Sequence, residues 1–244
     1  LSDDDENENP FRYPYDTPPH GVDYLNNHLT ALANYVDVAS RSQVELEWFI
    51  YPPEGDAYTA PKNLAWYGSA SDDKEQFERW VTFLYDALDL VEPDIPRIKG
   101  YDSYLVFNSS ISFQDILSTE LPALALTPAE FERFGIDMPS ETSTPQGKSS
   151  MWFIPQQIQQ PGGVIGMNGT FVSTFLASLG VPVLVNTAPG GSSVGGWTVM
   201  DIGSGNLIQR RTSAGDTTSV LGFVPCLPMA WEQIRLGWLE PVEV

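Results

Sequence analysis

The sequence predicts an α+β fold, with helices mainly in the N-terminal 140 residues or so and a mostly antiparallel β-sheet after about residue 150. Three observations predict it. Apolar residues recur at helical spacing in the first half, short β-type segments with abundant glycine follow Met151, and 42% of the 244 residues are hydrophobic, enough for a sizeable core. A β-sandwich or jelly roll with inserted helices is the alternative.

The chain divides by composition into a tail and two larger parts. Residues 1–21 predict an extended tail, because residues 3–8 are almost all acidic or amide and four prolines follow them. A Ser/Thr/Pro/Gln-rich stretch over 140–150 separates a helix-rich part, 22–140, from a β-rich part, 141–244, and the two parts can also form one continuous domain. The start at Leu1, without Met, indicates a processed chain or a fragment.

In the first half, spacing predicts two long helices. Apolar residues of 22–40 step by three and four, which makes one stripe, and 72–91 repeats the pattern after Ser71, the expected N-cap. A capping box, Thr127-Pro128-Ala129-Glu130, predicts a short helix over 128–134 that ends at Gly135. Strands are expected at 44–51 and 101–107, and one or two helical turns at 112–117.

In the second half, short apolar runs bounded by turn residues predict the sheet. The expected strands are 151–155, 181–187, 196–202, 206–212 and 218–224, with a hairpin turn at 201–206. Residues 168–179 are expected to form a helix that packs on this sheet, and 230–236 a last helical turn.

Charge and cysteine usage exclude several kinds of partner. The chain has 12 Lys+Arg against 32 Asp+Glu, a net charge of −20, which repels nucleic-acid backbones and anionic lipid surfaces. No run approaches the roughly 18 apolar residues of a membrane span. The single Cys226 lies in an apolar run and is interpreted as a buried small hydrophobe, so a reducing compartment is favoured.

No catalytic, cofactor or metal motif stands out. His20 and His28 are the only histidines, and each is interpreted as structural or surface-exposed. The glycine-rich stretch 189–196 lacks the Lys of a phosphate-binding loop. Nothing selects a glycosidase-type pair among the acids, although Asp94, Asp102 and Asp137 follow segments that could line a cleft. We therefore expect no enzymatic activity and no cofactor.

Aromatic residues in loops are the positive signal, because large rings in loops are typical of protein–protein contacts. The candidate contact residues are Phe11, Tyr13, Tyr15, Tyr58, Trp66 and Tyr67. The expected function is that of a structural subunit of a larger assembly, a viral coat or virion protein that contacts copies of itself or other subunits. Its location would then be the virion or the host cytoplasm. A carbohydrate-binding module or an acid-only glycoside hydrolase is the alternative.

Overall fold

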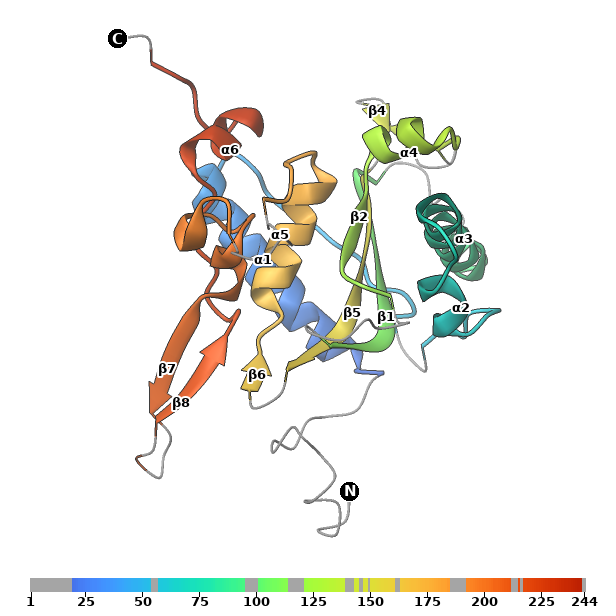
Figure 1. Ribbon diagram of the computed structural model, residues 1–244, viewed down its shortest axis with the longest axis horizontal. Helices are drawn as coiled ribbons and strands as arrows, with labels where there is room; N and C mark the ends of the chain where they lie inside the picture. Colours follow the sequence, from blue (N-terminus) through green and yellow to red (C-terminus); the bar gives the residue numbers. More distant parts are fainter. Residues whose placement is uncertain are drawn as a thin grey trace.

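A six-stranded mixed β-sheet forms the middle layer of the fold, and helices cover both of its faces (Figure 1). The computed structural model describes residues 19–53, 57–94, 101–113, 121–138, 143–144, 147–148, 150–160, 163–184, 192–211, 215 and 217–242. The strands of the sheet are β1 (Ser103–Phe113), β2 (Leu124–Leu126), β5 (Ser150–Gln160), β6 (Gly163–Ile165), β7 (Leu207–Arg211) and β8 (Thr217–Leu221). Helices α1 (Val22–Ser40) and α5 (Asn168–Ser178) lie on one face, and α2 (Leu64–Gly68) and α3 (Asp73–Val91) on the other.

Strand β5 lies at the centre of the sheet. It pairs in parallel with β1 on one edge, and antiparallel with β2 and then β6 on the other. Its side chains alternate between the layers: Trp152 and Ile154 pack against α1 and α5, whereas Met151 and Phe153 face α3. All four are buried, which is why this segment is a continuous apolar run in the sequence.

The long parallel pairing of β1 with β5 contains one irregularity. Its register shifts between Asn108 and Ile111, next to Pro155 of β5. Proline has no N–H to donate to a ladder, so a bulge at this point is the expected accommodation. The Asn108 side chain takes part in it by accepting a hydrogen bond from the Ser110 amide at 3.1 Å.

The helices α1 and α5 begin and end within one residue of the predicted positions. α1 covers 22–40 and buries its apolar stripe against the core. α5 is buried almost all round, because it lies between the sheet, α1 and the 3-10 turn η4 (Ile202–Gly205). A Cβ on Gly169 would collide with the Ser204 carbonyl, so only glycine permits this close approach of α5 to η4.

Capping residues determine where the helix α3, on the opposite face of the sheet, and a neighbouring short helix begin and end. The predicted capping box of α4 (Pro128–Phe134) is confirmed, and Gly135 ends the helix in the left-handed conformation, at φ 66° and ψ 37°. α3 begins one residue later than expected. Its N-cap is Asp72, whose carboxylate accepts the Glu75 amide at 2.8 Å, while the hydroxyl and amide of Ser71 donate to the Glu75 side chain.

Three of the predicted strands are not strands. Residues 44–50 are extended but have no strand neighbour among the described residues, and 181–184 and 198–201 are irregular. The hairpin expected at 201–206 is instead the turn η4, and the true hairpin joins β7 to β8. β7 lies within one residue of the strand predicted at 206–212, whereas β8 ends three residues short of the strand predicted at 218–224. Residues 111–113 extend β1 instead of beginning a helical turn, and 114–117 and 185–187 lie outside the described residues.

Helices and a small mixed sheet are both present, which supports the α+β class, but the predicted distribution of the two along the chain is not strict. β1 and β2 precede residue 140, α5 and α6 (Ala230–Arg235) follow it, and both β1–β5 and β6–β8 are parallel. The sheet packs against helices and not against a second sheet of the described residues, as a sandwich would require. The boundary predicted at residue 140 separates two strands, β1 and β5, that pair in one sheet. No described helix has the length and apolar character needed to cross a membrane.

Candidate functional site

Large apolar side chains are exposed on two stretches of the C-terminal part of the chain, and we call this set of residues the C-terminal face. Extensive exposed apolar surface often marks an interaction site. Trp197 is the most prominent member, at 84% exposed, and every member is at least 38% exposed. The face consists of Val194, Trp197, Ile202, Leu207, Phe223, Val224, Leu227, Trp231 and Ile234.

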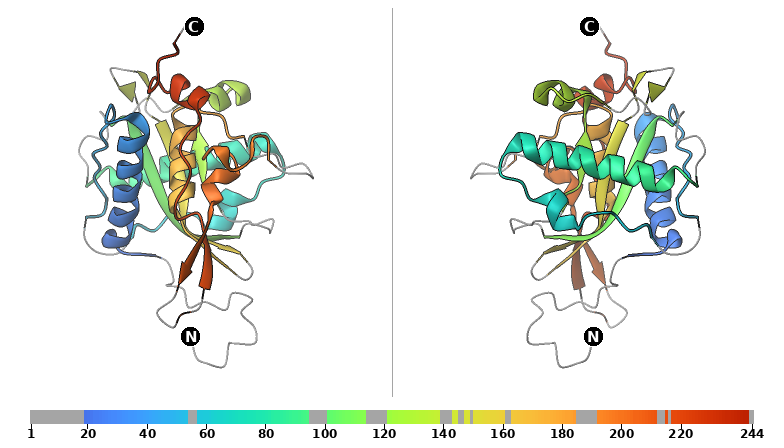
Figure 2. Two further views of the ribbon diagram at one scale, coloured as in Figure 1. Left: turned by 90° about the vertical axis from the view of Figure 1, so that its left-hand side faces the viewer. Right: turned by 90° about the vertical axis from the view of Figure 1, so that its right-hand side faces the viewer.

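Two stretches of chain form this face and lie side by side. The first contains the 3-10 turns η3 (Gly195–Trp197) and η4, and the second runs from the end of β8 to α6. Backbone hydrogen bonds of 3.1 Å join Gly222 to Asn206 and Cys226 to Gly203. The left panel of Figure 2 shows the two stretches together, above the β7–β8 hairpin. The two stretches that carry these exposed side chains therefore lie next to each other although they are apart in the sequence.

Asp201 fixes the first stretch. Burial alone raises the pKa of this carboxyl, but hydrogen bonds from Ser192 and from backbone amides outweigh burial and lower the pKa. The donors are Ser192 Oγ at 2.7 Å and the amides of Val194 at 2.8 Å, Ile202 at 2.8 Å and Gly195 at 3.2 Å. One ionised side chain thus holds the turns that present Trp197 and Ile202.

Glu232 fixes the second stretch to the first. Its side chain is fully buried, and its Oε2 accepts hydrogen bonds from the Thr198 hydroxyl and, at 2.8 Å, from the Met229 amide at the start of α6. Its Oε1 has no hydrogen-bond partner within the described part of the chain. The Thr198 and Met229 bonds give Glu232 a structural role, because they tie α6 to the turns before β7.

Charge is distributed very unevenly between the two halves of the chain. Residues 1–140 hold 26 of the 32 acids and 8 of the 12 Lys+Arg, a net charge of −18, whereas 141–244 carry a net charge of −2. Residues 149–200 contain no Asp, Glu, Lys, Arg or His at all. This distribution of charge indicates an uncharged surface in the C-terminal half, which the aromatic residues in loops did not indicate.

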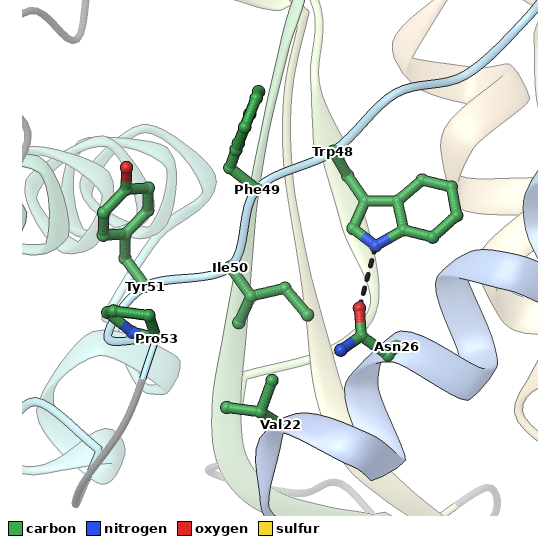
Figure 3. Close-up of a pocket in the computed structure, with 7 residues that line it drawn as sticks. All are labelled: Val22, Asn26, Trp48, Phe49, Ile50, Tyr51 and Pro53. Atoms are coloured by element: carbon green, nitrogen blue, oxygen red, sulfur yellow. Dashed lines mark hydrogen bonds between the residues drawn. The ribbon is translucent and has the colours of Figure 1, made fainter.

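A second surface feature is an open groove beside the N-terminal end of α1 (Figure 3). It has a volume of about 310 Å³ and is lined by Val22, Asn26, Trp48, Phe49, Ile50, Tyr51 and Pro53. The indole N–H of Trp48 donates to Asn26 Oδ1 at 2.9 Å, which fixes this ring against α1. Phe49 is 68% exposed, so the groove presents an aromatic, uncharged surface.

The two histidines are engaged in ring contacts. His20 stacks on Tyr24, with ring centroids 3.9 Å apart, and His28 stacks on Phe171 at 5.0 Å and bonds Asn168 through Nδ1 at 3.1 Å. Burial raises the pKa of the half-buried Cys226 thiol, so this thiol is a poor nucleophile. No group of three or more His, Cys, Asp or Glu within the described part of the chain is placed to hold a metal ion.

The predicted contact residues that the structure describes differ in how exposed their side chains are. Tyr67 is completely buried, with its hydroxyl donating to Asp86 at 2.5 Å, so it offers no surface to a partner. Burial, together with the hydrogen bond that Tyr58 donates to Asp94, raises the pKa of Tyr58 to about 12. Trp66 remains 37% exposed, with Lys62 Nζ 3.8 Å from the centre of its ring. Phe11, Tyr13 and Tyr15 lie outside the described residues.

Comparisons of the chain with protein-family models, with curated proteins and with solved structures find no match. The C-terminal face and the groove are thus the two features from which a function can be argued. Both expose apolar rings, the kind of side chain that most often dominates binding energy.

Proposed function

We propose that this protein is a structural subunit of a larger assembly, a coat or virion protein that acts by self-association. The C-terminal face carries this proposal. Its nine exposed apolar side chains would bury against an equivalent apolar surface, and burial of apolar area contributes about 25 cal/mol per Å². The two tryptophans among them belong to the residue type that most often dominates binding energy.

The charge of the chain favours a second copy of the same chain as the partner that binds the C-terminal face. Copies with a net charge of −20 repel one another at long range, so they can associate only through a surface that brings few charges together. The C-terminal face meets that condition, since it comes from the half with a net charge of −2. Arg235 is exposed beside Ile234, with its guanidinium 5.9 Å from the centre of the Trp231 ring, and is a charge that a contact through this face has to accommodate.

The acidic N-terminal half of the chain makes nucleic acid an unfavourable partner for the assembly. Residues 1–140 carry a net charge of −18, and strong negative charge opposes contact with nucleic-acid phosphates. In a coat protein this arrangement implies that the wall encloses a genome without gripping it. The proposed partners are accordingly other protein subunits.

The test removes apolar area without touching the core. We expect the triple variant Trp197→Ser, Leu207→Ser, Phe223→Ser to associate at least about tenfold more weakly than the wild type, because truncating even one hot-spot residue costs about 2 kcal/mol or more. Sedimentation velocity over a concentration series measures the change. Val38→Ser on α1 is the matched control, since Val38 is equally exposed, at 64%, but lies outside the face.

Two results would contradict the proposal. One is a wild-type chain that stays monomeric at high concentration and high salt. The other is association that the triple variant and the Val38→Ser control weaken equally, which would show that the C-terminal face has no special part in it.

A carbohydrate-binding role is the second candidate, and the groove is the observation that favours it. An exposed Phe49 beside Trp48 and the amide of Asn26 resembles the combination of ring and hydrogen-bonding group that holds a sugar. Binding to a glycan array that is abolished by Phe49→Ser would support this role. A wild-type chain that binds no glycan would remove it.

A further inference from the structure

We infer that two copies of this chain join their sheets at β7, with the two β7 strands antiparallel about a two-fold axis at Gln209. This inference rests on the proposed function, because it specifies how two copies are brought together. The free edge of β7, its hydrogen-bonding groups, its charge and its position beside the C-terminal face lead to it.

The strand β7 is one edge of the sheet. It pairs with β8 on one side and with no described strand on the other. Figure 1 shows the β7–β8 hairpin projecting from the body of the molecule, with β7 on the outside. At the opposite edge β1 is interrupted by its register shift after Asn108, whereas β7 contains no proline and pairs with β8 in one unbroken register. Because bulges and prolines keep an edge from pairing, β7 is the edge that is open to another strand.

The backbone hydrogen-bonding groups of β7 alternate between its two sides. The Gly222 amide donates to the Asn206 carbonyl at 3.1 Å, in the same register as the β7–β8 ladder. Every second pair of an antiparallel ladder is hydrogen-bonded, so the even-numbered residues of β7 direct their N–H and C=O groups toward β8. The odd-numbered residues direct theirs outward, and no backbone hydrogen bond joins these to another described segment. The outward residues are Leu207, Gln209 and Arg211.

A second copy of β7 matches all of these outward groups in one register. With the axis at Gln209, this residue lies opposite itself and Leu207 lies opposite Arg211, so each outward residue exchanges two hydrogen bonds with an outward residue of the other copy. The side-chain amide of Gln209 both donates and accepts, so two copies of it can bond each other. The alkyl stem of the exposed Arg211 can cover Leu207, which is 59% exposed. The identical strand is therefore a complete partner, and the pairing closes at a dimer because it uses both free edges.

The charge around the hairpin favours an approach of two acidic copies through this edge. Residues 202–231 contain only three charged residues, Arg210, Arg211 and Asp216, and so have a net charge of +1 in a chain of −20. The register places the two Arg211 residues about 13 Å apart along the strands, which exceeds the screening length of about 8 Å at 0.15 M salt. The two Arg210 residues lie about 7 Å apart along the strands, and added salt screens their repulsion. Two copies therefore repel each other less through the hairpin than through the acidic N-terminal half.

The position of β7 connects the strand pairing to the C-terminal face. A stable interface takes about 20 to 30 residues from each partner, and β7 has five, so strand pairing alone is too small to hold two copies together. Leu207 of the C-terminal face is the first residue of β7, and Phe223 and Val224 follow the end of β8 by two and three residues. Pairing of the two β7 strands thus brings exposed apolar side chains of this face next to the junction, where they can supply the remaining contact.

A cysteine at the two-fold axis tests the pairing directly. In a hydrogen-bonded antiparallel pair the Cα atoms are about 5.5 Å apart, which a disulfide can span. In a Cys226→Ser background, which removes the one native thiol, we expect Gln209→Cys to form a covalent dimer under mild oxidation about tenfold faster than Ser219→Cys, or more. Ser219 is the matched control, because it is exposed on the same hairpin, opposite Gln209, but lies on β8, one strand farther from the axis. Non-reducing gel electrophoresis over a time course measures both rates.

Removal of one outward N–H gives a second, independent readout. Gln209→Pro deletes the N–H group at the centre of the pairing and leaves the N–H groups that face β8 in place. We expect association to weaken about tenfold in sedimentation velocity, because the two-fold axis removes two hydrogen bonds at once. Gln209→Thr keeps the N–H group in a residue that suits a strand, and should associate like the wild type. Circular dichroism checks that both variants are folded.

The outcomes separate this inference from the proposed function. Equal rates of cross-linking at positions 209 and 219, or association that Gln209→Pro and Gln209→Thr weaken equally, would overturn the pairing of β7 strands. If the triple variant Trp197→Ser, Leu207→Ser, Phe223→Ser still weakens association in that case, self-association through the C-terminal face stands without strand pairing. A wild-type chain that stays monomeric at every concentration would overturn both.

Discussion

His28 shows how one side chain couples two helices of the core. It lies on α1 and contacts α5 twice, through its stack on Phe171 and its bond to Asn168, while Tyr24 packs edge-on at 4.6 Å. Burial is the main cause that lowers the pKa of His28 below its ordinary 6.5; the Asn168 bond opposes this and nearby His20 adds to it. The sequence placed His28 beside the apolar stripe, but a partner 140 residues away could not be predicted.

This lowered pKa makes stability depend on pH. At a pH above 6.5, His28 is neutral in both the folded and the unfolded chain, and its contribution to the free energy of unfolding is fully present. As the pH falls below 6.5, His28 takes up a proton in the unfolded chain more readily than in the folded chain, so the folded state loses stability. We expect urea unfolding of the wild type to show this loss between pH 7.5 and 5.5, and His28→Gln to reduce it. A pH dependence that His20→Gln removes and His28→Gln leaves intact would contradict the assignment.

At the scale of elements, local signals predicted helices better than strands. The capping box at Thr127 and the apolar stripe of α1 each involve residues close together in the sequence, so each helix could be predicted from its own residues. A strand also needs a neighbour. Residues 44–50 have the alternation of a strand and the correct buried side, yet no strand of the described residues lies beside them to accept their hydrogen bonds. Alternation predicts which side chains are buried, not whether a ladder forms.

The C-cap of α4 gives a prediction at this scale. Gly135→Ala should destabilise the fold by about 1 kcal/mol, because a Cβ is strained at its φ of 66° although nothing lies within 4 Å of it. Gly205→Ala is the matched control, since that site is equally open but is not left-handed. Urea denaturation at low salt compares the two, and equal effects would show that backbone conformation is not the cause.

At the scale of the whole molecule, charge and apolar surface are segregated. The half that carries a net charge of −18 contains α1 and α3, and the nearly neutral half supplies the central strand β5, the buried helix α5 and the C-terminal face. Composition alone indicated an acidic protein that binds no nucleic acid. It could not show that the turns before β7 and the segment from β8 to α6 lie next to each other, because the bonds that bring them together, such as Thr198 to Glu232, span long distances in sequence.

Sedimentation velocity of the wild-type chain over rising NaCl tests the central claim most directly. Salt screens the repulsion between copies of charge −20 and does not weaken an apolar contact, so association should strengthen from about 50 mM to 1 M salt. Oligomers that dissociate as salt is added, or a monomer at every concentration and salt, would contradict self-association through the C-terminal face.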